Sequence, residues 1–325
     1  MHFPKKNNGS AFSLYIENDS RNIGGPGSDQ NYTNGIKFSY IYAEDQIPSW
    51  SKPLINWNEY LKKHLADSET NYGISLSQQI YTPNDIQTAT LLKNDRPYAG
   101  WLYVGLMVRF KTEAHSDFLE LDIGVVGPEA LGEKVQNEFH KAIGQETAKG
   151  WDNQLGAEPG LQLTYQQRLR FLEYKVSQDR TLVDLIPYYG ASLGNIFIGA
   201  HAGAIIRVGN KLAHDFGPTR LSSGDGDAAV HTDAETDYKL NSETRVYGFA
   251  GAKGSLIGRD IFLDGNTFRD SHRVTKRAIV TETELGLGVE WARISAVWRF
   301  VVRSPQFVER DRFTSFASIS VNYYL

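Results

Sequence analysis

The sequence predicts an all-β protein built from about twelve antiparallel strands and one short helix. Apolar and polar residues alternate with the two-residue period of a strand through most of the chain, and a single segment has helical period instead. Twelve strands of about ten residues would occupy about 120 residues and leave about 200 for loops and turns, which is typical of a membrane β-barrel. A soluble β-barrel or sandwich shows the same alternation, so both interpretations stay open at this point.

The composition excludes several other classes of protein. The chain of 325 residues is 41% hydrophobic and 12% aromatic, so it can bury a large core and is not intrinsically disordered. It has no cysteine, which excludes disulfide frameworks, thiolate metal sites and cysteine nucleophiles. The formal net charge of -4 provides no basic field, so we expect no nucleic-acid partner. No run of about 18 apolar residues is present, which excludes a helical membrane protein.

The first ten residues, MHFPKKNNGS, are polar and lack the apolar segment of a secretory signal. Either the protein is cytoplasmic, or it is exported and its signal has been removed. We expect residues 1–10 to be a disordered polar leader. No linker or internal repeat divides the rest of the chain, so we expect residues 1–325 to form a single domain.

Twelve segments alternate strongly enough to predict strands. In the first of them, Phe12, Leu14 and Ile16 share one face, and the others repeat this pattern at greater length. In chain order the predicted strands are residues 12–17, 36–42, 72–81, 101–110, 118–126, 161–171, 182–190, 199–208, 245–257, 278–291, 294–302 and 313–325. The last strand runs to the final residue, as in outer-membrane barrels, although Leu325 stands where such barrels usually have an aromatic residue.

Two of these strands have a polar face that a soluble sandwich would have to bury. Strand 118–126 has Glu120 and Asp122 opposite its apolar face. Strand 161–171 has one face that is polar at five successive positions, namely Gln162, Thr164, Gln166, Arg168 and Arg170. Charged groups are seldom directed into the core of a soluble protein, whereas a membrane barrel has a polar interior. These strands therefore favour the barrel.

Two segments depart from the strand period. Within residues 128–144, the apolar positions lie four apart and form a helical stripe of Leu131, Val135, Phe139 and Ile143. A proline near the start of this segment and a glycine at its expected C-cap support the prediction of an amphipathic helix. Residues 211–238 are polar and contain SSGDGDAAVHTD, which predicts a long, mobile surface loop.

The helix carries a candidate general base. Gln136 and His140 are four residues apart and so lie on one face, and Glu146 follows just after the helix. An imidazole on a rigid element, with a carboxylate near enough to orient its other nitrogen, is suited to general-base catalysis. The alternative is an ordinary surface or packing histidine, which is the commoner role of a lone histidine on an amphipathic helix.

A second group of polar residues lies where the first two strands meet. Asn18 and Asp19 follow the first strand, where such residues commonly close an Asx turn. The alternative is a hard-cation site in which Asp19 supplies a carboxylate ligand. Thr33 opens the second strand on the same polar face as Lys37 and Ser39, so we expect its hydroxyl to point into the barrel. Because strands joined by a hairpin are neighbours, Asn18, Asp19 and Thr33 are expected to lie close together.

Arg96 precedes the fourth predicted strand and directly follows Asp95. A structural ion pair between the two is one interpretation, and binding of an anionic group such as phosphate is the other. Segments 215–218 and 260–272 are rich in turn-forming residues and are expected to be structural. The chain has no G-x-S-x-G or H-E-x-x-H motif, so no motif supports a serine hydrolase or a zinc protease.

Taken in order, ten short segments resemble the outer-membrane lipid A 3'-O-deacylase family over almost the whole chain. Among them are FSLYIEND, YTNG, QIYTP, NDRPYAGW, GVVGP, VQNEFH and GWDNQ. In full they are residues 12–19, 32–35, 79–83, 94–101, 124–128, 135–140, 150–154, 186–195, 215–218 and 261–266. No single segment is specific for the family, but the ordered set is.

The resemblance implies a twelve-stranded barrel in the outer membrane of a Gram-negative bacterium, with a short extracellular active-site helix at about residues 128–144. It also implies a Ca2+-dependent ester hydrolase that works like secreted phospholipase A2. In that mechanism His140 takes a proton from water, and Ca2+ held by Asp19 stabilises the oxyanion. The catalytic residues implied by the resemblance are Asn18, Asp19, Thr33, Gln136, His140 and Glu146.

The implied substrate is lipid A, the lipid anchor of lipopolysaccharide, from which the reaction removes the 3'-linked acyloxyacyl group. Residues 84–92 depart from the family because they lack the basic pair that suits a lipid A phosphate, and Lys93 and Arg96 are candidates to replace it. Another acylated envelope lipid therefore stays open as a substrate. A non-enzymatic pore or structural barrel and a soluble lipid-binding sandwich stay open as other functions. We expect a monomer in the outer-membrane bilayer.

Overall fold

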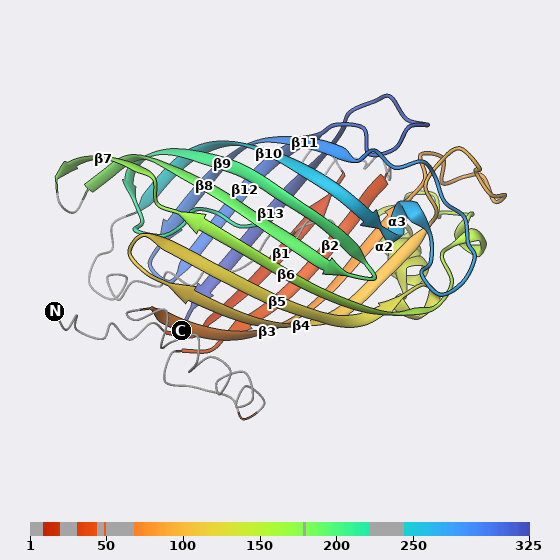
Figure 1. Ribbon diagram of the computed structural model, residues 1–325, viewed down its shortest axis with the longest axis horizontal. Helices are drawn as coiled ribbons and strands as arrows, with labels where there is room; N and C mark the ends of the chain where they lie inside the picture. The colour runs from red at the N-terminus through yellow and green to blue at the C-terminus, as the bar shows by residue number, and fades with distance from the viewer. Residues whose placement is uncertain (1–8, 20–30, 44–48, 50–67, 178–179, 222–243) are drawn as a thin grey trace.

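The structure is a computed structural model that describes residues 9–19, 31–43, 49, 68–177, 180–221 and 244–325. Within these residues, thirteen strands form one antiparallel sheet in the order β6-β5-β4-β3-β2-β1-β13-β12-β11-β10-β9-β8-β7. A further pairing of β6 with β8 closes 12 of them into a barrel and leaves β7 outside the ring (Figure 1). The closed barrel confirms the predicted fold class and excludes the sandwich.

The bounds of the elements agree closely with the predicted segments. The strands are β1 (Ala11–Asn18), β2 (Asn31–Ile41), β3 (Glu69–Thr82), β4 (Ala99–Lys111), β5 (His115–Val126), β6 (Glu158–Leu169), β7 (Leu172–Ser177), β8 (Arg180–Gly194), β9 (Phe197–Leu212), β10 (Arg245–Asp260), β11 (Ile279–Trp291), β12 (Ile294–Arg303) and β13 (Thr314–Tyr324). The helices are η2 (Pro128–Ala130), α2 (Gly132–Ile143), η3 (Trp151–Asn153) and α3 (Ile261–Asp264). None of these helices is long and apolar enough to cross a bilayer.

One predicted strand is divided in the structure, and the predicted leader is described only at its end. Residues 161–171 are predicted as one strand, but β6 ends at Leu169 and the chain resumes as the short strand β7, which pairs with the first part of β8. The disordered leader is predicted for residues 1–10, of which 1–8 lie outside the described residues. At its end the prediction is wrong, because Ser10 is buried and its hydroxyl accepts a hydrogen bond from the main-chain nitrogen of Ala43 at 3.2 Å. In Figure 1, the β7–β8 hairpin projects from the end of the barrel opposite α2 and α3.

The two faces of the barrel wall differ sharply in polarity. Along β11, Leu285 and Leu287 are exposed on the outside, while Glu282 and Glu284 are buried on the inside. A soluble barrel has the opposite arrangement, with apolar side chains inside. An apolar outer surface around a polar interior is the arrangement of a barrel that meets lipid on its outside.

The segment 213–221, which follows β9, folds into the barrel instead of lying on the surface. Apart from His214, its residues are buried, and three of its main-chain carbonyls accept hydrogen bonds from the wall. The Nη1 atom of Arg168 donates to the carbonyls of Phe216 and Pro218 at 3.1 and 3.0 Å, and Nη2 of Arg299 donates to the carbonyl of Thr219 at 3.0 Å. The buried main-chain groups of this segment are thereby satisfied by side chains of the barrel wall.

The predicted surface loop at residues 211–238 is therefore wrong over its first part. Lys211 and Leu212 belong to β9, and residues 213–221 are buried except for His214. Residues 222–238 lie outside the described residues. The polar composition of the segment suits the charged interior of a barrel as well as it suits solvent, so composition alone could not distinguish the two locations.

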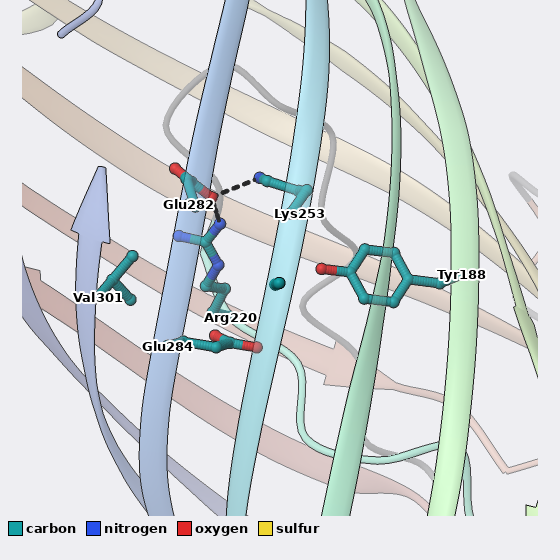
Figure 2. A pocket seen from close by; sticks show the side chains of 7 residues that line it. Tyr188, Arg220, Lys253, Glu282, Glu284 and Val301 are labelled. Atoms are coloured by element: carbon teal, nitrogen blue, oxygen red, sulfur yellow. Dashed lines mark hydrogen bonds and ion pairs between the residues drawn. The ribbon is translucent and has the colours of Figure 1, made fainter. Parts of the chain in front are cut away.

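Ion pairs cross the interior of the barrel beside this segment. A small cavity there is lined by Tyr188, Arg220, Ala252, Lys253, Glu282, Glu284 and Val301, and Figure 2 shows Glu282 contacting both Lys253 and Arg220. The carboxylate of Glu282 accepts from Lys253 at 2.8 Å and also from Arg220 and Arg303. Arg220 belongs to the segment 213–221, so this ion-pair network ties the segment to the wall.

Candidate active site

α2 lies against the ends of β3 and β4 because small residues let the backbones approach. A Cβ atom on Gly100 of β4 would lie 3.0 Å from the Cβ of Ala130 and 3.3 Å from the backbone nitrogen of Gly132. The side-chain amide of Gln78 on β3 donates to the carbonyl of Ala130 at 2.6 Å. These contacts hold the start of α2 on the barrel wall.

The helix is shorter than the predicted segment 128–144. Leu131 has a φ of 60°, in the left-handed region, and this residue separates the turn η2 from α2, which begins at Gly132. At the other end Gly144 has a φ of 73°, as the predicted glycine C-cap requires. The positive φ of Leu131 explains why the helical hydrogen bonds do not extend back to Pro128.

The polar side of α2 is the buried side. Gln136 and His140 are only 4% and 2% exposed, whereas the apolar stripe is between 41% and 54% exposed at Leu131, Val135, Phe139 and Ile143. An amphipathic helix on a soluble protein buries the opposite face. The two candidate catalytic side chains, Gln136 and His140, therefore lie on the face of α2 that packs against the rest of the protein.

His140 is oriented by the main chain of Glu146. The Nδ1 atom lies 2.6 Å from the carbonyl oxygen of Glu146. A carbonyl can only accept, so Nδ1 carries the proton and the basic nitrogen of the neutral ring is Nε2. The predicted role of Glu146 therefore changes: its carbonyl orients the imidazole, while the residue itself is exposed.

Gln136 is held by a tryptophan from the segment that follows the helix. Its Oε1 atom accepts a hydrogen bond of 2.9 Å from Nε1 of Trp151. Trp151 is fully buried and packs against Ile80 and Tyr98. The Nε2 atom of Gln136 is buried and has no hydrogen-bond partner among the described residues. It is an amide donor one helical turn from His140, suited to an oxygen atom of a ligand.

The second predicted group, at the ends of β1 and β2, is also brought together. The main-chain nitrogen of Asp19 donates to the carbonyl of Thr33 at 3.3 Å, and Asn18 pairs with Asn34 across the two strands. The hydroxyl of Thr33 lies 2.6 Å from that of Thr82 at the end of β3. These contacts agree with the expected proximity of Asn18, Asp19 and Thr33.

The expected direction of the Thr33 hydroxyl differs from the structure. A register shift between Tyr32 and Asn34 removes Thr33 from the alternation that directs Lys37 into the barrel. Its partner Thr82 instead lies two residues beyond Ile80, on the face of β3 that Trp151 covers. An irregularity of this kind has no signature in the alternation of the sequence.

β3 connects the two groups. Gln78, Ile80 and Thr82 follow one another on one face of this strand and contact, in turn, the start of α2, Trp151 and Thr33. The helix residues and the strand-end residues thus border the same strip of barrel wall. None of these three β3 side chains is predicted as a site residue from the sequence, because a contact between a helix and a distant strand leaves no spacing signal.

The strand-end group offers only oxygen ligands to a cation. The carboxylate of Asp19, the amide of Asn18 and the hydroxyls of Thr33 and Thr82 are the hard donors that Ca2+ prefers. The described residues contain no group of three or more histidine, aspartate or glutamate side chains that could hold a metal. The oxygen donors of the strand-end group are therefore of the kind that binds Ca2+. They comprise one carboxylate, from Asp19, and neutral amide and hydroxyl oxygens.

The two candidate phosphate-binding residues have different environments. Arg96 is 1% exposed, its guanidinium lies 4.8 Å from the ring centre of Tyr81, and burial lowers its pKa from the usual value. Its main-chain nitrogen donates to the carboxylate of Asp95 at 2.8 Å. A buried guanidinium presents no surface to a lipid phosphate, so these contacts indicate a structural role. Lys93 is exposed.

Comparison with known proteins identifies the family of the chain and solved structures with a similar fold. The family model described as "Outer membrane protein LpxR" matches residues 3–325. A search of curated protein sequences returns no match. The solved structure of LpxR from Salmonella typhimurium superposes with a TM-score of 0.76 at 20% identity, covering 97% of this chain and 100% of that one. The β domain of the Bordetella autotransporter BrkA gives a TM-score of 0.45 at 10% identity, covering 97% and 98%.

Proposed function

The chain belongs to the LpxR family of outer membrane proteins, and on this basis we propose that it is a Ca2+-dependent ester hydrolase acting on lipid A. The reaction would remove the 3'-linked acyloxyacyl group. The family match and the 12-strand barrel place the protein in the outer membrane of a Gram-negative bacterium. The observation that carries the proposal is the buried His140, whose Nδ1 atom is held by the carbonyl of Glu146.

In the proposed reaction, His140 acts as the general base. Its Nε2 atom takes a proton from water while the water oxygen attacks the ester carbonyl carbon. The resulting oxyanion collapses, the bond between the carbonyl carbon and the sugar oxygen breaks, and the imidazolium returns its proton to that oxygen. The products are the free acyloxyacyl acid and a lipid with a 3'-hydroxyl group.

Two groups are suited to stabilise the oxyanion. The buried amide donor of Gln136 is oriented by Trp151 and lies one helical turn from His140. Asp19, with Asn18 and Thr33, would hold Ca2+, which when bound supplies positive charge for the developing oxyanion. Because the amide donor is fixed before substrate binds, it costs little reorganisation during the reaction.

The proposal is tested by the release of fatty acid from purified lipid A. With Ca2+ present we expect hydrolysis by the wild-type protein, its loss with a chelator, and a decrease of about 10² to 10⁴-fold in kcat for His140→Ala. His115→Ala is a matched control, because His115 lies on β5 at the end of that strand away from α2 and contacts Asp117. Full activity of His140→Ala would refute the general-base role.

The substrate is tested in the same assay. Phosphatidylethanolamine vesicles are incubated in parallel with lipid A, since residues 84–92 lack a basic side chain and another acylated envelope lipid is the alternative substrate. If only the phospholipid is hydrolysed, and His140→Ala abolishes this hydrolysis, the ester chemistry is supported but the substrate is a phospholipid and not lipid A.

A further inference from the structure

Three cationic residues lie in two connections that meet at the end of the barrel that carries α2. Arg310 and Arg312 lie in the connection between β12 and β13, and Nη1 of Arg310 donates to Oδ1 of Asn84 in the connection between β3 and β4. The main-chain nitrogen of Asn84 in turn donates to Asp95 at 2.8 Å, across a turn that contains Lys93. Two connections that are distant in sequence thus meet, and between them they carry all three cations.

Two of these cations, Lys93 and Arg312, have no acidic partner among the described residues. Lys93 and Arg312 are exposed, and neither forms an ion pair within the part of the chain that the structure describes. Asp311 lies between the two arginines in sequence, but its carboxylate pairs with Arg277 at 3.2 Å. Burial lowers the pKa of Arg310, and the positive charge of Arg312 acts in the same direction, against the opposing effect of Asp95. Arg312 lies two residues from Arg310 and has no ion pair of its own among the described residues, so its charge is available to a bound anion.

The cations lie beside the candidate active site. Asn84 is two residues beyond Thr82, so the Cα atoms of Asn84 and Thr82 are at most about 7 Å apart. Thr82 in turn contacts Thr33 of the strand-end group. The same connection also packs on the segment that follows α2. The main-chain nitrogen of Lys149 donates to the carbonyl of Ile86 at 2.8 Å, and the side chain of Gln87 donates to the carbonyl of Thr147 at 3.3 Å.

We propose that Lys93, Arg310 and Arg312 bind a phosphate monoester on the headgroup of the lipid substrate. Guanidinium groups match phosphate oxygens in a bidentate manner, and a flexible lysine adds a point charge. The proposal rests on the proposed function for the identity of the lipid. It assigns headgroup recognition to the β12–β13 connection, in place of the buried Arg96 and of residues 84–92, which have no basic side chain.

The test is equilibrium binding of two lipids that differ only in phosphate. Purified protein carrying His140→Ala is titrated with micelles of lipid A that retains both phosphates, and with micelles of the same lipid A after removal of its phosphates. We expect about tenfold tighter binding of the phosphorylated lipid, and a decrease of about threefold in this preference for Lys93→Gln and for Arg312→Gln. Arg293→Gln is the matched control, because Arg293 is an exposed arginine in the turn between β11 and β12.

Equal binding of the two lipids, or an unchanged preference in the double variant Lys93→Gln/Arg312→Gln, would overturn the proposal. Hydrolysis by the protein with His140 intact is measured separately. If the protein hydrolyses neither lipid but its binding preference depends on Arg312, the proposed function fails and the phosphate site stands. If it hydrolyses both lipids but binds them equally, the phosphate site alone fails.

Discussion

At the scale of single residues, the main-chain contact of His140 changes the role expected of its neighbour. From the sequence, Glu146 is expected to orient the imidazole through its carboxylate. In the structure the main-chain carbonyl oxygen of Glu146 accepts a hydrogen bond from Nδ1 of His140, with 2.6 Å between the two atoms. The Glu146 residue itself is exposed. Any residue that preserves the main-chain path from Gly144 to Ala148 would therefore supply the same hydrogen bond.

Glu146→Gln is expected to retain activity within about threefold of the wild type, because the substitution leaves the main-chain acceptor of His140 in place. The measurement is kcat for lipid A hydrolysis, compared with His140→Ala in the same preparation. A loss as large as that of His140→Ala would assign the essential contact to the Glu146 carboxylate.

The sequence predicts the proximity of Gln136 and His140 better than it predicts their surroundings. The four-residue spacing of Gln136 and His140 correctly places them on one helix face. That this face is buried could not be predicted, because an apolar stripe such as Val135 and Phe139 ordinarily marks the buried side. Trp151 and Thr82 could not be assigned to the site, because their contacts depend on how separate elements pack.

At the scale of elements, alternation predicts the strands well because the two faces of the wall differ strongly in polarity. Each predicted strand overlaps an observed one. The break between β6 and β7 could not be predicted, because the polar and apolar residues of 161–171 continue to alternate across it. Alternation shows which residues lie on each face of a strand. It does not show where one strand ends and the next begins if the alternation continues across the break.

The attachment of α2 to the barrel depends on the close approach at Gly100. Gly100→Val is expected to displace the helix and reduce lipid A hydrolysis by at least about tenfold, because small misplacements of catalytic groups are costly. The added side chain would meet Ala130 and Gly132 at the start of the helix. The measurement is the rate of hydrolysis together with heat-modifiable gel mobility, which reports barrel folding.

Gly254→Ala on β10 is the control for this substitution, because a Cβ at Gly254 would meet no atom within 4 Å. It is expected to leave both readouts unchanged. Wild-type activity in a folded Gly100→Val barrel would show that the position of α2 does not depend on this contact.

At the scale of the whole molecule, a segment of the chain itself occupies part of the barrel interior. The segment 213–221 is hydrogen-bonded to arginines of the wall, and Arg220 pairs with Glu282 across the lumen. The sequence could predict a polar interior from strands such as 161–171, but not that a polar connection would occupy it. These contacts disfavour the alternative in which the protein is an open pore.

We therefore expect no stable channel conductance when the purified protein is inserted into planar bilayers. Deletion of residues 213–221 is expected to produce conductance, since it removes the segment that occupies the lumen. Folding of the deletion variant is checked by heat-modifiable gel mobility. Stable, porin-like conductance of the wild-type protein would contradict an occluded barrel.

The central claim, that this barrel removes an acyloxyacyl group from lipid A, is tested most directly by a mass spectrum. Lipid A is extracted from Gram-negative cells that carry the wild-type protein, the His140→Ala variant or neither in the outer membrane. We expect a species lighter by the 3'-linked acyloxyacyl group in cells with the wild-type protein alone. Lipid A of unchanged mass in those cells, with the folded protein present in the outer membrane and Ca2+ in the medium, would contradict it.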